Sequence, residues 1–293
     1  MRTLKLRNPG FLYVLPAVLG IFCVMLFPLI YTIVLGFNKS TLYTDTWEFV
    51  GISQFVDLLT KPEFLSSIVN TFEWTVYSVF FQFLLGFILA VLINQEFIKF
   101  KWLIRILLMI PWVLPSIISV NIWKWLYHPD FGYLNHILME FGLISTPINW
   151  VSDPRYAMAA VVIVNVWKMF PLVMIMIEAS LQSVPNELKD AAKIDGATGI
   201  REFFTVTVPH VSSTCYTIIL LLIIWTLNAF TFIYALTGGG PANSTEILSM
   251  YIFKEAFQNY NYGVAGAAST VLFVITAAVS VVYLKLIVKG DKG

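Results

Sequence analysis

Long apolar runs, separated by shorter polar stretches, follow one another along the whole chain. Runs of roughly 20 apolar residues have the length that an α-helix needs to cross the hydrocarbon core of a bilayer. These runs do not alternate apolar and polar positions, which argues against the strands of an outer-membrane barrel. The pattern therefore predicts an all-α integral membrane protein with six transmembrane helices, at residues 11–36, 70–94, 103–126, 157–181, 212–236 and 262–288.

Composition supports a membrane protein. Hydrophobic residues make up 58% of the chain and charged residues 12%, whereas soluble domains carry about 25% charged residues. The net charge of +1 gives no indication of nucleic-acid binding. We see no separate soluble domain, so the prediction is a single transmembrane domain over residues 1–293. Cys23 and Cys215 fall inside predicted spans, where we expect apolar packing rather than a disulfide or a metal site.

Basic residues divide unevenly between the two sets of connections that six spans create. Such a bias places the richer set in the cytoplasm, so both termini are expected to be cytoplasmic. The richer set comprises both termini and the second-to-third and fourth-to-fifth connections, with Arg2, Lys5, Arg7, Lys99, Lys101, Arg105, Lys189, Lys193, Arg201, Lys285, Lys289 and Lys292.

One cytoplasmic connection, residues 183–210, carries the signals of a helix, a turn and a second helix. Pro185 suits a helix start and Asn186 is a candidate cap. Gly196 is predicted to break the first helix, and Pro209 to stop the second helix before the fifth span. Small side chains on the first helix would let another protein approach its backbone closely, although a helix pair lying on lipid headgroups fits the same pattern.

This connection resembles the coupling loop of the integral-membrane subunits of ABC importers. The family's loop runs Glu-Ala-Ala, three residues, Gly, nine residues, and Ile-x-Leu-Pro. At the same spacing the chain has Asp190-Ala191-Ala192, Gly196 and Val206-Thr207-Val208-Pro209. Asp in place of Glu, and Val in place of Ile and Leu, keep the charge and the apolar character.

Other stretches resemble the carbohydrate branch of that family, in particular the larger maltose permease subunit and the glycerol-phosphate permease. They are LLMIPWVLPS at 107–116, NVWKMFP at 165–171 and LTGGGP at 236–241. The resemblance covers nearly the whole chain and implies the type I ABC importer permease fold in a compact six-helix version. It also implies the cytoplasmic (inner) membrane of a bacterium or archaeon as the location.

The resemblance implies a mechanism and a set of partners. In the family, the first helix of the loop docks in a groove of a cytoplasmic ATPase, and the ATPase cycle rocks the transmembrane bundle between two access states. The expected partners are a second homologous permease subunit, two ATPase subunits and an extracytoplasmic solute-binding protein. The residues implied for ATPase coupling are Glu187, Asp190, Ala191, Ala192, Asp195, Gly196 and Pro209.

The chain itself offers no nucleotide site and no catalytic constellation. It lacks the Gly-x-x-x-x-Gly-Lys-Ser/Thr sequence of a phosphate-binding loop. His128, His136 and His210 lack metal-ligand spacing. We therefore expect no enzyme activity, no metal and no cofactor in this chain, with ATP and Mg²⁺ bound by the partner ATPase subunits.

Polar and aromatic residues within the spans are the candidates for solute contact. A sugar needs donors and acceptors for its hydroxyls and a flat aromatic surface for its ring. Trp225 with Thr226 and Asn228, and Trp112 with Ser116, offer both kinds of contact.

Lys168 is the basic residue deepest in a predicted span, and Asn165 lies one helical turn away. Lys168 is either a donor to the solute or a structural lysine paired with helix-end carbonyls or a carboxylate. Local resemblance to the maltose subunit adds further positions. The predicted solute-binding set is Trp112, Ser116, Asn165, Lys168, Met169, Leu172, Trp225, Thr226, Asn228 and Ala229.

The predicted function is a permease subunit of an ATP-driven importer that translocates a sugar or oligosaccharide by alternating access. One alternative is the same architecture importing glycerol phosphate, amino acids or polyamines. Another is an ion-coupled secondary transporter, which the absence of paired acidic residues deep in the predicted spans disfavours.

Overall fold

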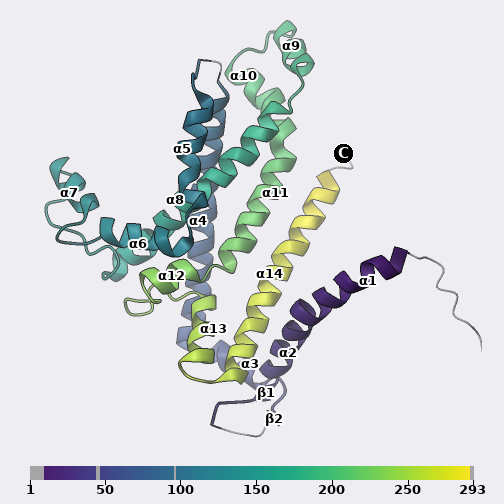
Figure 1. Cartoon of the computed structure of the whole chain (residues 1–293), viewed down its shortest axis with the longest axis vertical. Coiled ribbons are helices and arrows are strands. Elements are labelled where there is room, and N and C mark those ends of the chain that lie inside the picture. The colour runs from purple at the N-terminus through teal and green to yellow at the C-terminus, as the bar shows by residue number, and fades with distance from the viewer. Residues whose placement is uncertain (1–9, 44–46, 96, 291–293) are drawn as a thin grey trace, which may run out of the picture. The chain divides into compact units, whose positions relative to one another are not determined.

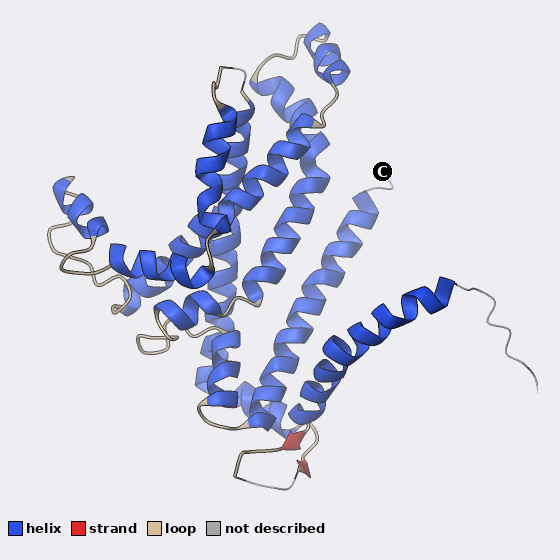
Figure 2. Cartoon of the chain, in the orientation of Figure 1, coloured by secondary structure: helices blue, strands red, loops and turns tan. Residues whose placement is uncertain are grey.

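The computed structural model describes residues 10–43, 47–95 and 97–290. Regular structure in these residues is helical apart from one two-stranded ladder of two residues per strand (Figure 2). The predicted all-α membrane fold is thus confirmed, with this short ladder as an addition. Four basic residues used in the topology prediction, Arg2, Lys5, Arg7 and Lys292, lie outside the described residues.

The elements follow one another along the chain as Figure 1 labels them. They are α1 Gly10–Ile21, a π-helical segment Phe22–Leu26, α2 Phe27–Gly36, β1 Asn38–Lys39, β2 Glu48–Phe49, α3 Ser53–Thr60, α4 Pro62–Asn94, α5 Lys101–Val113, α6 Ser116–Leu126, α7 Tyr133–Glu140, α8 Pro154–Gln182, α9 Asn186–Ile194, α10 Ile200–Glu202, a second π-helical segment Phe203–Thr207, α11 Val208–Leu227, α12 Thr231–Leu236, α13 Leu248–Phe257 and α14 Tyr262–Gly290.

Long apolar helices account for the predicted spans. Among the described residues, five helices are long and apolar enough to cross a membrane, or six if α5 and α6 together form one bent span. The helices α4, α8 and α14 contain the predicted spans 70–94, 157–181 and 262–288 and extend beyond them. The predicted spans 103–126 and 212–236 differ from the structure, because each contains a break in the helix.

The internal contacts of the chain fall into two compact units. The first unit comprises residues 1–62 and 251–273, and the second comprises residues 63–250 and 274–293. In the first unit, an apolar stretch of 18 residues within the span Tyr13–Gly36 contains no buried residue. Lipid tails cover apolar side chains as well as protein does, so hydropathy cannot reveal which helices pack together.

Small residues let helices cross closely in the first unit. A Cβ added to Gly36 at the end of α2 would lie 2.9 Å from the backbone nitrogen of Ala267 in α14. The Gln54 side chain of α3 donates to the carbonyls of Gly36 and Asn38, at 3.2 and 2.8 Å. This hydrogen bonding satisfies the backbone where α2 ends, as an apolar surrounding requires.

The core of the second unit lies between α4, α8 and α11, and α5 packs against α8. Gly86 marks the closest approach of α4 to α8, because a Cβ there would lie 2.6 Å from the Cβ of Val173. The buried apolar residues of this core are Val79, Ala90, Ile93, Val173, Met174, Ile177, Leu181, Val184, Val211, Ile218 and Leu222.

Polar contacts fix these helices to one another. Trp74 of α4 donates its indole N–H to the carbonyl of Thr226, near the end of α11, at 3.0 Å. The Arg105 guanidinium of α5 donates from Nε to both carboxylate oxygens of Glu178 on α8, at 3.0 and 2.9 Å. Inside a bilayer such polar side chains face the bundle interior and pair with one another.

Candidate functional site

A sharp corner between α5 and α6 replaces the continuous helix predicted over 103–126. The two helices are bent by 96° across Leu114 and Pro115. Pro115 has no backbone N–H and disfavours the helical conformation of the residue before it. Leu114 accordingly adopts an extended conformation, with φ −61° and ψ 140°. The second helix begins at Ser116.

A second break replaces the helix predicted over 212–236. The helix α11 ends at Leu227, and α12 begins at Thr231. The Asn228 side chain donates to the carbonyl of Ile224 at 2.8 Å, a local contact that competes with continued helix. The hydroxyl of Ser249 donates to the carbonyl of Ala229 at 2.7 Å, so the interrupted backbone has a partner.

A cavity of about 270 Å³ lies where the two breaks and α8 meet. The helices α6, α8 and α12 contact one another around it, and Figure 1 shows them close together in the second unit. Seven of the ten residues predicted for solute binding line this cavity, namely Ser116, Asn165, Met169, Trp225, Thr226, Asn228 and Ala229. Sequence reasoning thus gathered most of one spatial cluster from three separate stretches of chain.

The lining of the cavity offers hydrogen-bonding groups beside an aromatic surface. Trp225 is 45% exposed. Asn165 is 3% exposed, and its Nδ2 has no hydrogen-bond partner among the described residues. A buried amide without a partner is costly, and this nitrogen is itself fully buried. None of the residues lining the cavity is charged. This combination suits a neutral solute with hydroxyl groups.

Three predicted residues lie outside the lining of the cavity: Trp112, Lys168 and Leu172. Trp112 is 40% exposed and Leu172 is half-buried. Lys168 is 6% exposed. Its ammonium group donates to the carbonyls of Pro111 and Trp112, at 3.0 and 2.7 Å, and also to that of Leu114. Of the two alternatives for Lys168, the geometry matches the structural lysine paired with helix-end carbonyls.

Sequence reasoning missed three residues of the lining: Phe230, Thr231 and Phe232. They follow the break at Asn228, which the prediction placed inside a continuous span. Asn228 could have indicated that the helix ends there, because Asn is a poor residue for a helix interior.

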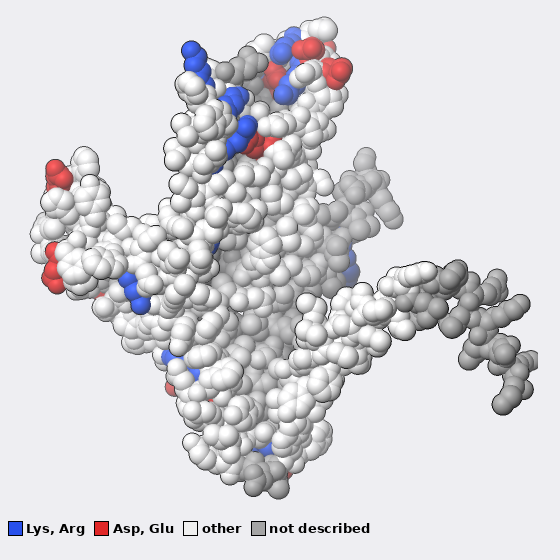
Figure 3. Space-filling view, viewed as in Figure 1, with Lys and Arg blue, Asp and Glu red and all other residues white. Residues whose placement is uncertain are grey.

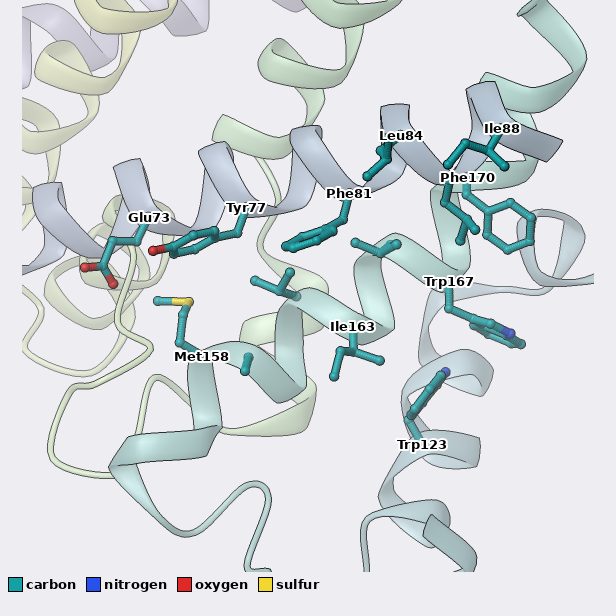
Figure 4. Close-up of a pocket in the computed structure, with 14 residues that line it drawn as sticks. Glu73, Tyr77, Phe81, Leu84, Ile88, Trp123, Met158, Ile163, Trp167 and Phe170 are labelled. Carbon is teal, nitrogen blue, oxygen red and sulfur yellow. The ribbon is translucent and has the colours of Figure 1, made fainter. Parts of the chain in front are cut away.

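A larger groove of about 800 Å³ on the second unit has a different chemistry. Apolar side chains of α4 and α8 line most of its length. Figure 4 shows Glu73 and Tyr77 at one end and Trp123 and Trp167 at the other. A sugar needs polar partners around its ring, so the smaller cavity is the better candidate for a solute.

The stretch 183–210 begins as predicted with a short exposed helix. The helix α9 buries none of its residues. Gly196 follows it with φ +79°, and its N–H donates to the carbonyl of Lys193 at 3.0 Å. The N–H of Ala197 donates to the carbonyl of Ala192 at 2.8 Å. This pair of bonds closes the helix in a Schellman arrangement, which favours glycine at the left-handed position.

Pro209 does not stop the second helix, contrary to the prediction. Residues from Ile200 to Leu227 form one helical stretch, in which Phe203–Thr207 is π-helical and α11 starts at Val208. Proline has no N–H for the helical hydrogen-bond ladder, and the irregular π-helical segment ends at Thr207, just before Pro209. The stretch 183–210, in which ATPase coupling is predicted and which is called the coupling stretch below, therefore continues directly into α11, the helix that reaches Trp225 at the cavity.

The residues predicted for ATPase coupling lie on the surface of one end of the second unit. Ala192 is half-buried, and the remaining six, Glu187, Asp190, Ala191, Asp195, Gly196 and Pro209, are exposed. A hollow of about 910 Å³ beside α9 is lined by this stretch, by Asn94 at the end of α4, and by Gln95 and Phe97 of the α4–α5 connection. Figure 3 shows Lys and Arg side chains gathered at this end together with Asp and Glu side chains.

Comparisons with known proteins agree with this architecture. The chain is 32% identical over 280 residues to the trehalose/maltose transport system permease protein MalF of Thermococcus litoralis, covering 94% of this chain and 92% of that protein. It is 33% identical over 244 residues to the sulfoquinovosyl glycerol transport system permease protein SmoG of Agrobacterium fabrum, covering 83% and 78%.

A solved structure shares the fold. It is a chain of a bacterial alginate ABC transporter in complex with an alginate pentasaccharide-bound periplasmic protein, with a TM-score of 0.80 and 22% identity. The match covers 93% of this chain and 91% of that chain. The family model of the binding-protein-dependent transport system inner membrane component matches residues 82–289. This chain therefore belongs to the family of binding-protein-dependent transport system inner membrane components, the multi-pass permeases of ABC transporters.

Proposed function

We propose that this permease carries a neutral sugar or oligosaccharide through the cavity between the two helix breaks. The observation that carries the proposal is the lining of the cavity. The indole of Trp225 lies beside the amides of Asn165 and Asn228 and the hydroxyl residue Ser116, and no charged residue takes part. Relatives named for trehalose/maltose and for sulfoquinovosyl glycerol transport support the same substrate class.

A charged solute fits the cavity less well. Glycerol phosphate, polyamines and amino acids each carry charge, and a buried charge needs an opposite charge or several hydrogen bonds. Lys168, the nearest cation along α8, donates its N–H groups to three backbone carbonyls. The chemistry of the lining therefore favours a sugar over these alternatives.

The energy for transport comes, in this proposal, from ATP hydrolysed by separate subunits. Two cytoplasmic ATPase subunits bind ATP and Mg²⁺, and the α9 helix docks on one of them. A second homologous permease completes the membrane unit, and both termini face the cytoplasm. An extracytoplasmic protein delivers the sugar. The alginate transporter, in complex with a periplasmic protein that holds a pentasaccharide, illustrates such an assembly for its own system.

Uptake of sugars by the reconstituted complex tests this proposal. Trp225→Ala removes the aromatic surface and is expected to lower uptake about five- to thirtyfold with assembly intact, because stacking on a sugar contributes on the order of 1–2 kcal/mol. Trp102→Ala, at an exposed tryptophan of α5 that does not line the cavity, is the matched control. Equal sugar uptake by the two variants would reject the cavity as the path of the sugar, and ATP-driven uptake of charged solutes alone would reject the sugar assignment.

A further inference from the structure

The carbonyl end of α5 needs partners that its own helix does not supply. A helix leaves its last four carbonyls without intrahelical donors, and the bilayer core supplies no water for them. Pro115 worsens the deficit, because a residue without an N–H cannot bond the carbonyl of Pro111 four positions earlier. The corner between α5 and α6 is therefore a costly place to break a helix unless another group donates to it.

Lys168 supplies those donors from the neighbouring helix α8. Its Nζ lies 3.0 Å from the carbonyl oxygen of Pro111 and 2.7 Å from that of Trp112, and it also donates to Leu114. A lysine ammonium has three N–H donors and no acceptor. Three acceptors use all three donors, so none is left for a solute. A positive charge at a helix carboxyl end is further stabilised by the helix dipole.

The same corner forms part of the solute cavity. Ser116, the first residue of α6, lines the cavity, as do Asn165 and Met169, which flank Lys168 on α8. We propose that Lys168 is a positioning residue: it binds the open carbonyl end of α5 to α8 and thereby sets the 96° corner that places Ser116 in the wall of the cavity. The role of that cavity in sugar transport rests on the proposed function.

Two attachments between α5 and α8 would make these helices move together. The helix α8 ends at Gln182, and α9 begins shortly afterwards at Asn186. Arg105 and Glu178 join α5 to α8 at the end of α8 next to α9, called the coupling end here, and Lys168 joins the two helices at the corner. The helix α5 is thus fastened to α8 at two levels, and the corner at Ser116 moves with α8 when the coupling end moves.

A thiol-labelling experiment on the assembled complex tests the geometry without any solute. Ser116→Cys is introduced into a chain with Cys23→Ala and Cys215→Ala, and the rate of modification by a small maleimide is measured. Adding Lys168→Met is expected to change that rate at least about fivefold, because the corner loses three hydrogen bonds. Lys124→Met, at an exposed lysine of α6, is the matched control and is expected to leave the rate unchanged.

A second reporter separates a local change from misfolding. Ile194→Cys on α9 is labelled at the same rate in the Lys168→Met and wild-type backgrounds if only the corner has moved. Should Lys168→Met fail to assemble, Lys168→Gln, which keeps a neutral donor, takes its place and is expected to give a smaller change of the same direction. Lys168→Arg is expected to return the Ser116→Cys rate to within about twofold of wild type, since it keeps charged donors.

Uptake kinetics complete the test. If Lys168 is a positioning residue, Lys168→Met and Lys168→Arg are expected to differ mainly in maximal uptake rate. This difference should follow the difference in their Ser116→Cys labelling rates. An unchanged labelling rate in Lys168→Met or Lys168→Gln, together with a raised KM for the sugar, would overturn the proposal and make Lys168 a solute contact. Absence of sugar uptake even in the wild-type chain would reject the proposed function, while the labelling would still decide the role of Lys168.

Discussion

Single residues at the turns explain why this sequence departs from continuous helix where it does. Gly196 ends α9 with φ +79°, and nothing lies within 4 Å of a Cβ added there. Its requirement is therefore conformational rather than steric. The sequence predicted the break at this glycine, and the structure adds that the left-handed backbone, and not close contact at the glycine itself, is the reason for it.

The backbone requirement at Gly196 makes a specific prediction. Gly196→Val is expected to destabilise the α9 turn by about 1–2 kcal/mol and to reduce co-purification of the ATPase subunits. Gly196→Asn is the control, because asparagine accepts the left-handed conformation at this helix position. Co-purification from solubilised membranes is the measurement. Equal recovery of ATPase with Val and with Asn would show that the turn geometry does not matter for docking.

Helices were more predictable from this sequence than their interruptions. The runs behind α8 and α14 predicted those helices to within about three residues at each end, whereas α4 begins at Pro62 and not at residue 70 as predicted. The corner at Leu114–Pro115 and the break at Asn228 lie within apolar runs, and hydropathy does not show where the backbone leaves the helical conformation. Most cavity residues were predicted from their chemistry and from the resemblance. Phe230 and Phe232 were missed because their position depends on the unpredicted break.

The close packing of α4 against α8 at Gly86 gives a prediction about these helices. Gly86→Ala is expected to destabilise the second unit by about 1–3 kcal/mol, because the added methyl would overlap Val173 on α8. Gly20→Ala in α1 is the control, since nothing lies within 4 Å of its added Cβ and alanine favours a helix by up to about 1 kcal/mol. Thermal unfolding of the purified protein compares the two. A lower midpoint for Gly20→Ala than for Gly86→Ala would contradict this account of the α4–α8 crossing.

At the scale of the second unit, the coupling stretch and the cavity share their helices. The α8 helix runs from the residues that line the cavity to the start of α9, and α11 runs from the coupling stretch to Trp225. Ser180 of α8 donates to Thr214 of α11 at 3.0 Å, which joins these two helices near the coupling end. A ligand shifts a conformational equilibrium only through differential binding to its states. Docking of an ATPase at α9 would act on the cavity walls through these two helices.

In the proposed mechanism, α9 faces the cytoplasm and binds the ATPase there. Ile194 is 86% exposed at the end of α9, which makes Ile194→Cys a suitable reporter in a chain that lacks Cys23 and Cys215. Labelling by a membrane-impermeant maleimide in sealed vesicles of known orientation is the measurement. The account predicts modification from the cytoplasmic side only, and protection when the ATPase subunits are bound. Modification from the opposite side, or an equal rate with and without the ATPase, would contradict it.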